Sequence, residues 1–102
     1  MTPSHPVVAR LVGAINAGDR DAFLATLAPD VTLTDDGTPR PLEDWIDREI
    51  FSAHGHFTAD SEAEGGLALR VRFRNDTWGE MSTFWRFQVA GDRISRIETG
   101  QA

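Results

Sequence analysis

The sequence predicts an α+β fold in which three N-terminal helices lie across the concave face of a curved antiparallel sheet. Apolar residues recur at helical spacing through the first half of the chain. From residue 57 onward apolar and polar residues alternate, as they do in strands with one buried face. Glycine-containing segments separate these runs and suit hairpin turns. A chain of 102 residues has room for one modest core, so a single domain over residues 1–102 is expected.

The first helix is expected over Pro6–Ala17, because proline is compatible with a first helical turn and Ser4 is a candidate cap. Its apolar stripe consists of Val8, Leu11, Val12 and Ile15. Gly18 fits the position after the helix, where a left-handed backbone suits glycine.

Asp19 is expected to cap a short second helix through its carboxylate. The apolar face of this helix is assigned to Ala22, Phe23 and Leu27. Pro29 is expected to end the helix because proline lacks the helical N–H.

The following strand, Val31–Asp35, carries the main candidate for chemistry. Val31, Leu33 and Asp35 share one face, so an inward position for the two apolar residues also turns the carboxylate inward. The alternative is a turn carboxylate, in which Asp36 and Gly37 form the turn and Asp35 accepts from nearby backbone N–H groups.

A third helix is expected over Pro41–Phe51, followed by a loop over Ser52–His56. Its inward side chains are Leu42, Trp45, Ile46 and Ile50.

Three alternating runs then predict two hairpins. In the first hairpin, a turn at Glu64–Gly66 keeps apolar residues opposite one another, and glycine supplies the positive φ that the turn needs. It pairs Phe57 with Phe73, Ala59 with Val71, and Asp60 with Arg70. A loop at Asn75–Thr77 pairs Val71 with Met81, Leu69 with Thr83, Leu67 with Trp85, and Arg72 with Glu80.

In the last strand, Arg93–Thr99, Ile94 and Ile97 have opposite parity. This predicts either a bulge near Ser95 or an outer face that is itself partly buried.

The segment INAGDRDAFLATLAPDVTLTDDG, Ile15 to Gly37, resembles the nuclear transport factor 2-like superfamily. It is similar in particular to the SnoaL-like polyketide cyclases and the ketosteroid isomerases. The later order of elements, closing in AGDRISRIE, extends the resemblance over nearly the whole chain. The resemblance implies a cone-shaped, strongly curved sheet of the cystatin-like type that holds a pocket, and an outer sheet face that makes a homodimer.

By this resemblance Asp35 falls where the isomerases carry their catalytic base, which removes a proton from carbon next to a carbonyl. The isomerases' tyrosine in the first helix aligns with Leu11, and this chain has no tyrosine. Their strand aspartic acid aligns near Thr83, a weaker donor. Steroid isomerisation is therefore not expected, because donors for the enolate oxygen are missing.

The candidate ligand-binding residues are Leu11, Trp45, His54, His56, Met81, Thr83, Trp85 and Phe87. The aromatic residues make either a wall for an apolar ligand or only a filled core. His54 and His56 suit metal binding or proton transfer, but no third ligand stands at a recognised spacing. The simpler interpretation is that one caps the third helix and the other is exposed, and neither a metal nor a cofactor is expected.

The composition of the chain excludes some classes of binding partner and of chemistry. The net charge of −6 argues against nucleic acid and anionic membranes, and the absence of cysteine excludes disulfides and thiol catalysis. No long apolar run or secretory signal is visible, so a cytoplasmic location is expected.

Two functions are expected as alternatives. One is a dimeric module that binds a small apolar ligand or a partner protein, with Phe84 and Arg86 on its outer sheet face. The other is a proton-transfer enzyme of isomerase, cyclase or hydrolase type, with Asp35 as acid or base on a small apolar or polyketide-like substrate. An open pocket containing the Asp35 carboxylate would favour the enzyme, whereas a cone filled by aromatic side chains would favour the module.

Overall fold

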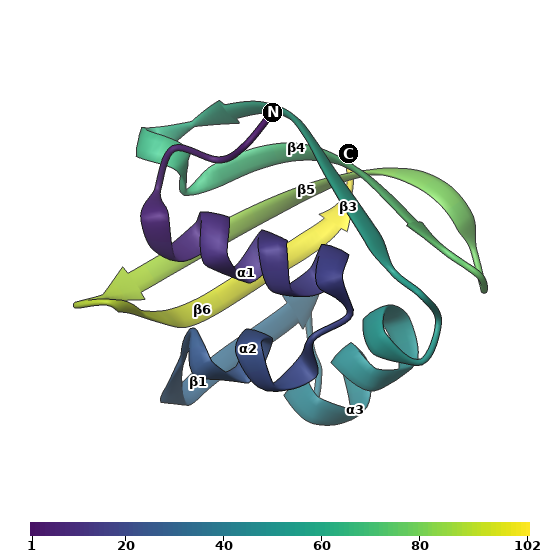
Figure 1. The fold of residues 1–102 in the computed structure, drawn as a ribbon, viewed down its shortest axis with the longest axis horizontal. Helices are drawn as coiled ribbons and strands as arrows, with labels where there is room; N and C mark the ends of the chain where they lie inside the picture. The colour runs from purple at the N-terminus through teal and green to yellow at the C-terminus, as the bar shows by residue number, and fades with distance from the viewer.

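Six strands form one curved sheet in the computed structural model, which describes residues 1–102 (Figure 1). The strands are β1 (Leu27–Asp35), β2 (Thr38–Pro39), β3 (His56–Ala63), β4 (Ala68–Asn75), β5 (Gly79–Ala90) and β6 (Arg93–Gln101). They lie in the order β2-β1-β6-β5-β4-β3. The α+β class is confirmed, but the sheet is mixed rather than purely antiparallel, because β1 runs parallel to its neighbour β6.

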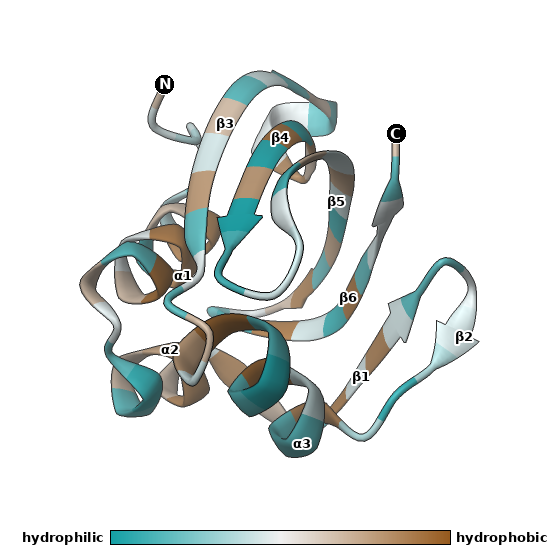
Figure 2. Cartoon of the chain, turned by 90° about the vertical axis from the view of Figure 1, so that its right-hand side faces the viewer, coloured by the Kyte–Doolittle hydropathy of each residue, from teal (hydrophilic) through white to brown (hydrophobic).

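Three helices lie against the concave side of this sheet, and the strands curl around them (Figure 2). They are α1 (Pro6–Ala17), α2 (Arg20–Ala25) and α3 (Leu42–Ile46), and α3 continues into a π-helical turn, Asp47–Phe51. The bounds of α1 are those predicted. Together α3 and the π-helical turn occupy most of the third predicted helix.

The helix caps differ in part from the prediction. Asp19 caps α2 as expected, because its carboxylate accepts from the N–H of Ala22 at 3.0 Å. The cap of α1 is His5 rather than Ser4. Pro29 does not end α2: the helix stops at Ala25, and Leu27 already pairs with β6 as the first residue of β1.

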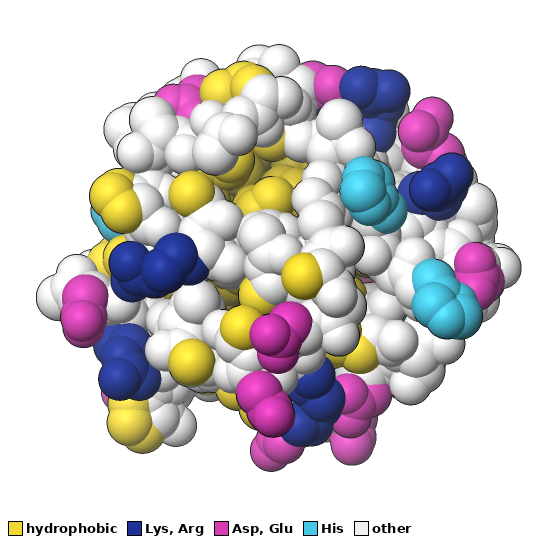
Figure 3. Space-filling model, viewed as in Figure 1, with side chains coloured by type: hydrophobic (Ala, Val, Ile, Leu, Met, Phe, Trp, Pro, Cys, Tyr) yellow, Lys and Arg dark blue, Asp and Glu magenta, His cyan; other side chains and the backbone are white.

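Arg20 joins α2 to the third helical segment. Its guanidinium donates to Asp47 at 2.7 Å and to Glu43 at 2.9 Å. Figure 3 shows acidic side chains gathered around a basic one over α2 and α3. The hydrogen bonds to Asp47 and Glu43 raise the pKa of Arg20 above its ordinary value.

The first hairpin follows the predicted register only near its open end. Phe57 lies opposite Phe73 and Ala59 opposite Val71, but the register shifts between Ala59 and Ser61. Beyond this bulge, Ser61 pairs with Arg70, Glu62 with Leu69, and Ala63 with Ala68. The predicted Asp60–Arg70 pairing is therefore wrong. The turn holds four residues instead of three, and the bulge compensates for the extra residue.

The second hairpin is shifted by two residues from the prediction. Asn75 pairs with Gly79, Val71 with Thr83, Leu69 with Trp85, and Arg74 with Glu80. The loop is Asp76–Trp78, because the side chain of Asn75 accepts from the N–H of Trp78 at 2.8 Å. A shift of two residues preserves the faces, so Thr83, Trp85 and Phe87 still point inward and are buried.

The bulge predicted near Ser95 is confirmed. Val89 pairs with Ile94 whereas Gln88 pairs with Arg96, so Ser95 is the extra residue. The bulge allows both Ile94 and Ile97 to be buried.

Trp85 lies at the centre of an aromatic cluster that fills the interior of the cone. Its ring centroid lies 5.1 Å from Phe57, 6.0 Å from Phe73, 6.1 Å from Trp45 and 6.3 Å from Phe87. These distances are typical of packed aromatic pairs.

The outer edge of β3 is covered by the N-terminal part of the chain. The side-chain amide of Asn16 donates to the carbonyl of Phe57 at 2.9 Å and accepts from its N–H at 2.8 Å. The N–H of Ser4 donates to Glu62 at 2.9 Å. These contacts satisfy an edge that would otherwise be open to pairing with another strand.

The ion pair between Asp60 and Arg72 is expected to make folding stability depend on pH. Hydrogen bonds from Arg72 hold the pKa of Asp60 below its ordinary 3.8. A carboxyl with a lowered pKa stabilises the fold above its unfolded pKa, and this contribution is lost as pH falls through the folded value. Asp60→Asn should therefore reduce stability at neutral pH, and the difference from the wild type should shrink as pH falls below about 4.

Urea midpoints at several pH values would measure this difference. Asp92→Asn is the control, because Asp92 is exposed and lies 3.9 Å from its arginine. A gap between Asp60→Asn and the wild type that is as large in acid as at neutral pH would contradict the prediction.

Candidate functional site

A cavity of about 280 Å³ opens where the end of β1, the π-helical turn and the β4–β5 hairpin meet. Its wall combines carboxylates, arginines and aromatic side chains. The lining residues are Asp35, Asp36, Arg40, Trp45, Arg48, Glu49, Phe73, Trp78, Met81, Thr83, Trp85, Thr99, Gly100 and Gln101.

Asp35 reaches this wall because it is the last residue of β1. Its pairing with Thr99 of β6 fixes the backbone there. The side chain is half-buried, and its Oδ2 accepts a hydrogen bond from Trp45 Nε1 at 3.1 Å. Oδ1 has no partner in the protein. The carboxylate is therefore oriented by one oxygen and free to accept with the other.

The role of turn carboxylate belongs to Asp36. Asp36 adopts a positive φ of 51°, and its Oδ1 accepts from the N–H of Gln101 at 3.0 Å. Its own N–H donates to the carbonyl of Thr99 at 2.9 Å. The chain thus turns one residue after Asp35, which leaves Asp35 facing the cavity.

The π-helical turn and the β4–β5 loop form the opposite rim. Arg48 and Glu49 come from the π-helical turn, a type of segment that is frequent at functional sites. Trp78 is 62% exposed, and its Nε1 donates to Glu49 Oε2 at 3.0 Å. The buried side chain of Asn75 holds the two segments together by donating to the carbonyl of Glu49 at 2.8 Å. The exposed indole is thereby held at the cavity rim.

The two arginines that line the cavity differ in their ion pairs. Arg48 lies 3.5 Å from Glu49, which also accepts from Trp78. Arg40 lines the cavity but forms no ion pair. Arg40 is thus the one unpaired cation among the lining residues.

Five of the nine expected site residues line the cavity: Asp35, Trp45, Met81, Thr83 and Trp85. Leu11 and Phe87 are not among the lining residues, and both are buried in the core. His54 lies on the surface 2.6 Å from Asp76, and His56 is exposed at the start of β3. These four residues of the expected site do not line this cavity. No group of three histidine, aspartate or glutamate side chains is placed to hold a metal ion.

Sequence reasoning missed the rim residues, above all Arg40, Arg48, Glu49 and Trp78. Arg48 and Glu49 reach the cavity through a π-helical turn, which helical periodicity does not reveal. The only local signal was Asn75, a residue type that accepts hydrogen bonds within turns and so marks the loop that carries Trp78.

Thr83 is poorly placed to donate to a ligand. Its hydroxyl donates to the carbonyl of Val71 at 3.2 Å and accepts from Trp85 Nε1 at 3.2 Å. Both functions of the hydroxyl are therefore used inside the protein.

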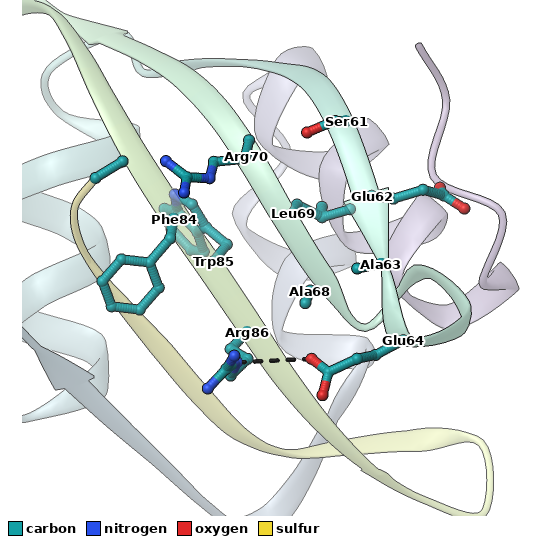
Figure 4. A pocket seen from close by; sticks show the side chains of 11 residues that line it. Ser61, Glu62, Ala63, Glu64, Ala68, Leu69, Arg70, Phe84, Trp85 and Arg86 are labelled. Carbon is teal, nitrogen blue, oxygen red and sulfur yellow. Dashed lines mark ion pairs between the residues drawn. The ribbon is translucent and has the colours of Figure 1, made fainter.

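A second depression, of about 640 Å³, lies on the outer face of the sheet (Figure 4). Arg70, Phe84 and Arg86 project from β4 and β5 on this face, and Arg86 lies 3.7 Å from Glu64. Phe84 is half-buried next to Gly100, where a Cβ atom would come within 2.9 Å of the phenyl ring. The surface thus combines an aromatic side chain with surrounding charges.

Solved structures with the same fold span nearly the whole chain. A nuclear transport factor 2-like protein of unknown function from Cytophaga hutchinsonii has a TM-score of 0.78 at 11% identity, covering 97% of this chain and 89% of its own. A "putative polyketide cyclase" from Sinorhizobium meliloti has a TM-score of 0.76 at 21% identity, covering 91% and 92%. The Δ5-3-ketosteroid isomerase from Mycobacterium sp. has a TM-score of 0.77 at 16% identity, covering 97% and 92%.

The protein therefore has the nuclear transport factor 2-like fold, as the residues from Ile15 to Gly37 indicated. At these identities the likeness is one of fold. No protein-family profile and no curated protein matches the sequence.

None of the helices has the length and apolar character needed to span a membrane.

Proposed function

We propose that the protein binds a small, largely apolar molecule in the cavity beside Asp35. The observation that carries this proposal is the half-buried carboxylate of Asp35, which lines a cavity with aromatic side chains, is held through one oxygen by Trp45 and has no protein partner on the other oxygen. Such a combination of apolar walls and few convergent polar groups is typical of ligand pockets.

The size of the cavity limits the ligand. Pockets for drug-sized molecules have volumes of about 300–1,000 Å³, and this one has about 280 Å³. Trp45 and Trp85 close it from the inside, because both are buried in the aromatic cluster. A molecule with one ring fits this space better than a large polycyclic one.

Filling the cavity is expected to abolish binding. Met81→Trp adds volume to a half-buried lining residue, whereas Val89→Trp adds similar volume at a half-buried inner position of the same strand outside the cavity. A screen of small cyclic compounds by thermal shift, with tryptophan fluorescence as a second readout, would identify ligands, because binding to the folded state raises apparent stability. Ligands should stabilise the wild type and Val89→Trp but not Met81→Trp. Equal stabilisation of both variants, or no ligand in the screen, would refute the proposal.

A proton-transfer enzyme is the second candidate, and the free oxygen of Asp35 favours it. A general base must reach the proton that it removes. Asp35 lines the cavity, and its Oδ1 has no partner in the protein. Against this function, the hydroxyl of Thr83 is already engaged, so it does not serve as the donor that stabilises a developing oxyanion.

The outer face of the sheet is proposed as the contact surface of a homodimer. Phe84 provides an apolar centre, and the surrounding arginine and glutamate side chains provide a polar rim, as in many interfaces. The opposite side of the molecule carries the acidic residues of α2 and α3, which would repel a second copy. The sheet face is therefore the favoured surface for self-association.

Ser82→Arg is expected to weaken this dimer. Ser82 is exposed on the outer face of β5, where a long cation would crowd Phe84 and add charge. Light scattering at micromolar concentration should give a dimer mass for the wild type and a lower mass for the variant. Ser52→Arg, which makes the same change on the helical side, should remain dimeric. A monomer mass for the wild type would contradict the proposal.

A further inference from the structure

We infer that the molecule bound beside Asp35 is a flat, single-ring compound with a hydrogen-bond donor at one end and a carboxylate at the other. This inference rests on the proposed function and names its ligand class. It follows from two charged groups that line the cavity, one oxygen of Asp35 and the guanidinium of Arg40, for which the protein supplies no partner.

The hydrogen-bond donor of the ligand is inferred from the carboxylate of Asp35. Oδ2 is occupied by Trp45 Nε1, so only Oδ1 remains for a ligand. An ionised carboxylate oxygen accepts but does not donate. The ligand group that meets it must therefore supply a hydrogen, as a hydroxyl or an N–H does.

The carboxylate of the ligand is inferred from the guanidinium of Arg40. Among the other charged lining residues, Asp36 accepts from the N–H of Gln101 and Glu49 accepts from Trp78. The charge of Arg48 is partly compensated by Glu49, whose Oε1 lies 3.5 Å from Arg48 Nε. Arg40 is the lining arginine without an ion pair, and its exposed guanidinium is available to a ligand. Its planar set of donors matches a carboxylate in a bidentate geometry.

The flat shape of the ligand follows from the aromatic and apolar side chains that line the same cavity. Trp78 holds an exposed indole at the rim, and Phe73 and Met81 add apolar surface. An exposed aromatic ring beside a cavity offers a surface on which another ring can stack. The volume of about 280 Å³ restricts that ring system to a small one.

Three probes separate the contributions of the two ends. 4-Hydroxybenzoate carries both groups, 4-hydroxybenzamide lacks the anionic charge, and benzoate lacks the donor. Titrations followed by tryptophan fluorescence would give their dissociation constants, because all three tryptophans of the protein line this cavity. 4-Hydroxybenzoate should bind most tightly of the three.

Arg40→Gln is expected to weaken binding of 4-hydroxybenzoate by about three- to tenfold, as for loss of a charge-assisted hydrogen bond from an exposed side chain. The same variant should bind 4-hydroxybenzamide as the wild type does. Arg10→Gln is the matched control, because Arg10 is an exposed, unpaired arginine on α1 outside this cavity. Thermal unfolding of both variants would verify that they remain folded.

The possible outcomes separate this inference from the proposed function. If 4-hydroxybenzamide binds as tightly as 4-hydroxybenzoate, or if Arg40→Gln has no effect, the anionic end is refuted. If benzoate binds as tightly as 4-hydroxybenzoate, the donor end is refuted. Binding of neutral compounds alone, blocked by Met81→Trp, overturns the inference but preserves the proposed function. No binding of any compound overturns both.

Discussion

Replacing Trp85 by alanine is expected to lower the free energy of unfolding by about 3–5 kcal/mol, the usual cost of removing a buried large aromatic side chain. Trp85 is 2% exposed and contacts the rings of four other aromatic residues. Its removal leaves a cavity that these neighbours fill only in part. A loss of this size is a large share of the 5–15 kcal/mol that stabilises a typical small domain.

Urea titration would measure the effect as a lower midpoint with an unchanged slope. Trp78→Ala is the control, because Trp78 is 62% exposed and its loss should cost less than about 1 kcal/mol. Similar losses for the two variants would contradict the central position of Trp85 in the core.

Replacing Asp35 by asparagine is expected to weaken binding of 4-hydroxybenzoate by about tenfold or more, because a hydrogen bond to a charged acceptor is lost. The asparagine oxygen would turn toward Trp45 Nε1, which leaves the amide –NH₂ facing the ligand donor. The fold should survive, since this side chain has one hydrogen-bond partner and is only half-buried.

The same variant separates the binding module from the enzyme. A catalytic base acts on a carbon-bound proton, so Asp35→Asn would then keep substrate affinity and lose turnover by about 10²–10⁴-fold. Asp36→Asn is the matched control, because asparagine can still accept the hydrogen bond from Gln101. If Asp35→Asn changes stability but neither affinity nor turnover, Asp35 has a structural role only.

The sequence predicted helices and strands well where one side chain, or the regular spacing of apolar residues, controls the local backbone. The bounds of α1 follow from its apolar stripe and from Gly18, which adopts a φ of 66°. The cap at Asp19 and the bulge at Ser95 likewise depend on neighbouring residues. The inner row of β5 was also predictable, because the alternation of side chains in a strand is unaffected by a shift of two residues.

Register and rim geometry depend on interactions between distant segments. Alternation fixes which face a residue occupies but not its partner, so the shift to Asn75–Gly79 pairing was decided by the side chain of Asn75. The parallel pairing of β1 with β6 joins segments more than 60 residues apart in the sequence, Leu27 with Ile94 for example, and β1 begins already at Leu27.

The sequence by itself determined the fold class, the three helices, the inner face of the sheet and the position of Asp35 at the end of a strand. Only the tertiary structure decided that Trp45 orients the carboxylate, that Asp36 rather than Asp35 makes the turn, and that Arg40 and Trp78 reach the same cavity. The physical reason is that local periodicity is set within a few residues. The cavity, in contrast, is assembled from β1, the π-helical turn and the β4–β5 hairpin, which meet only when the sheet curls around the aromatic core.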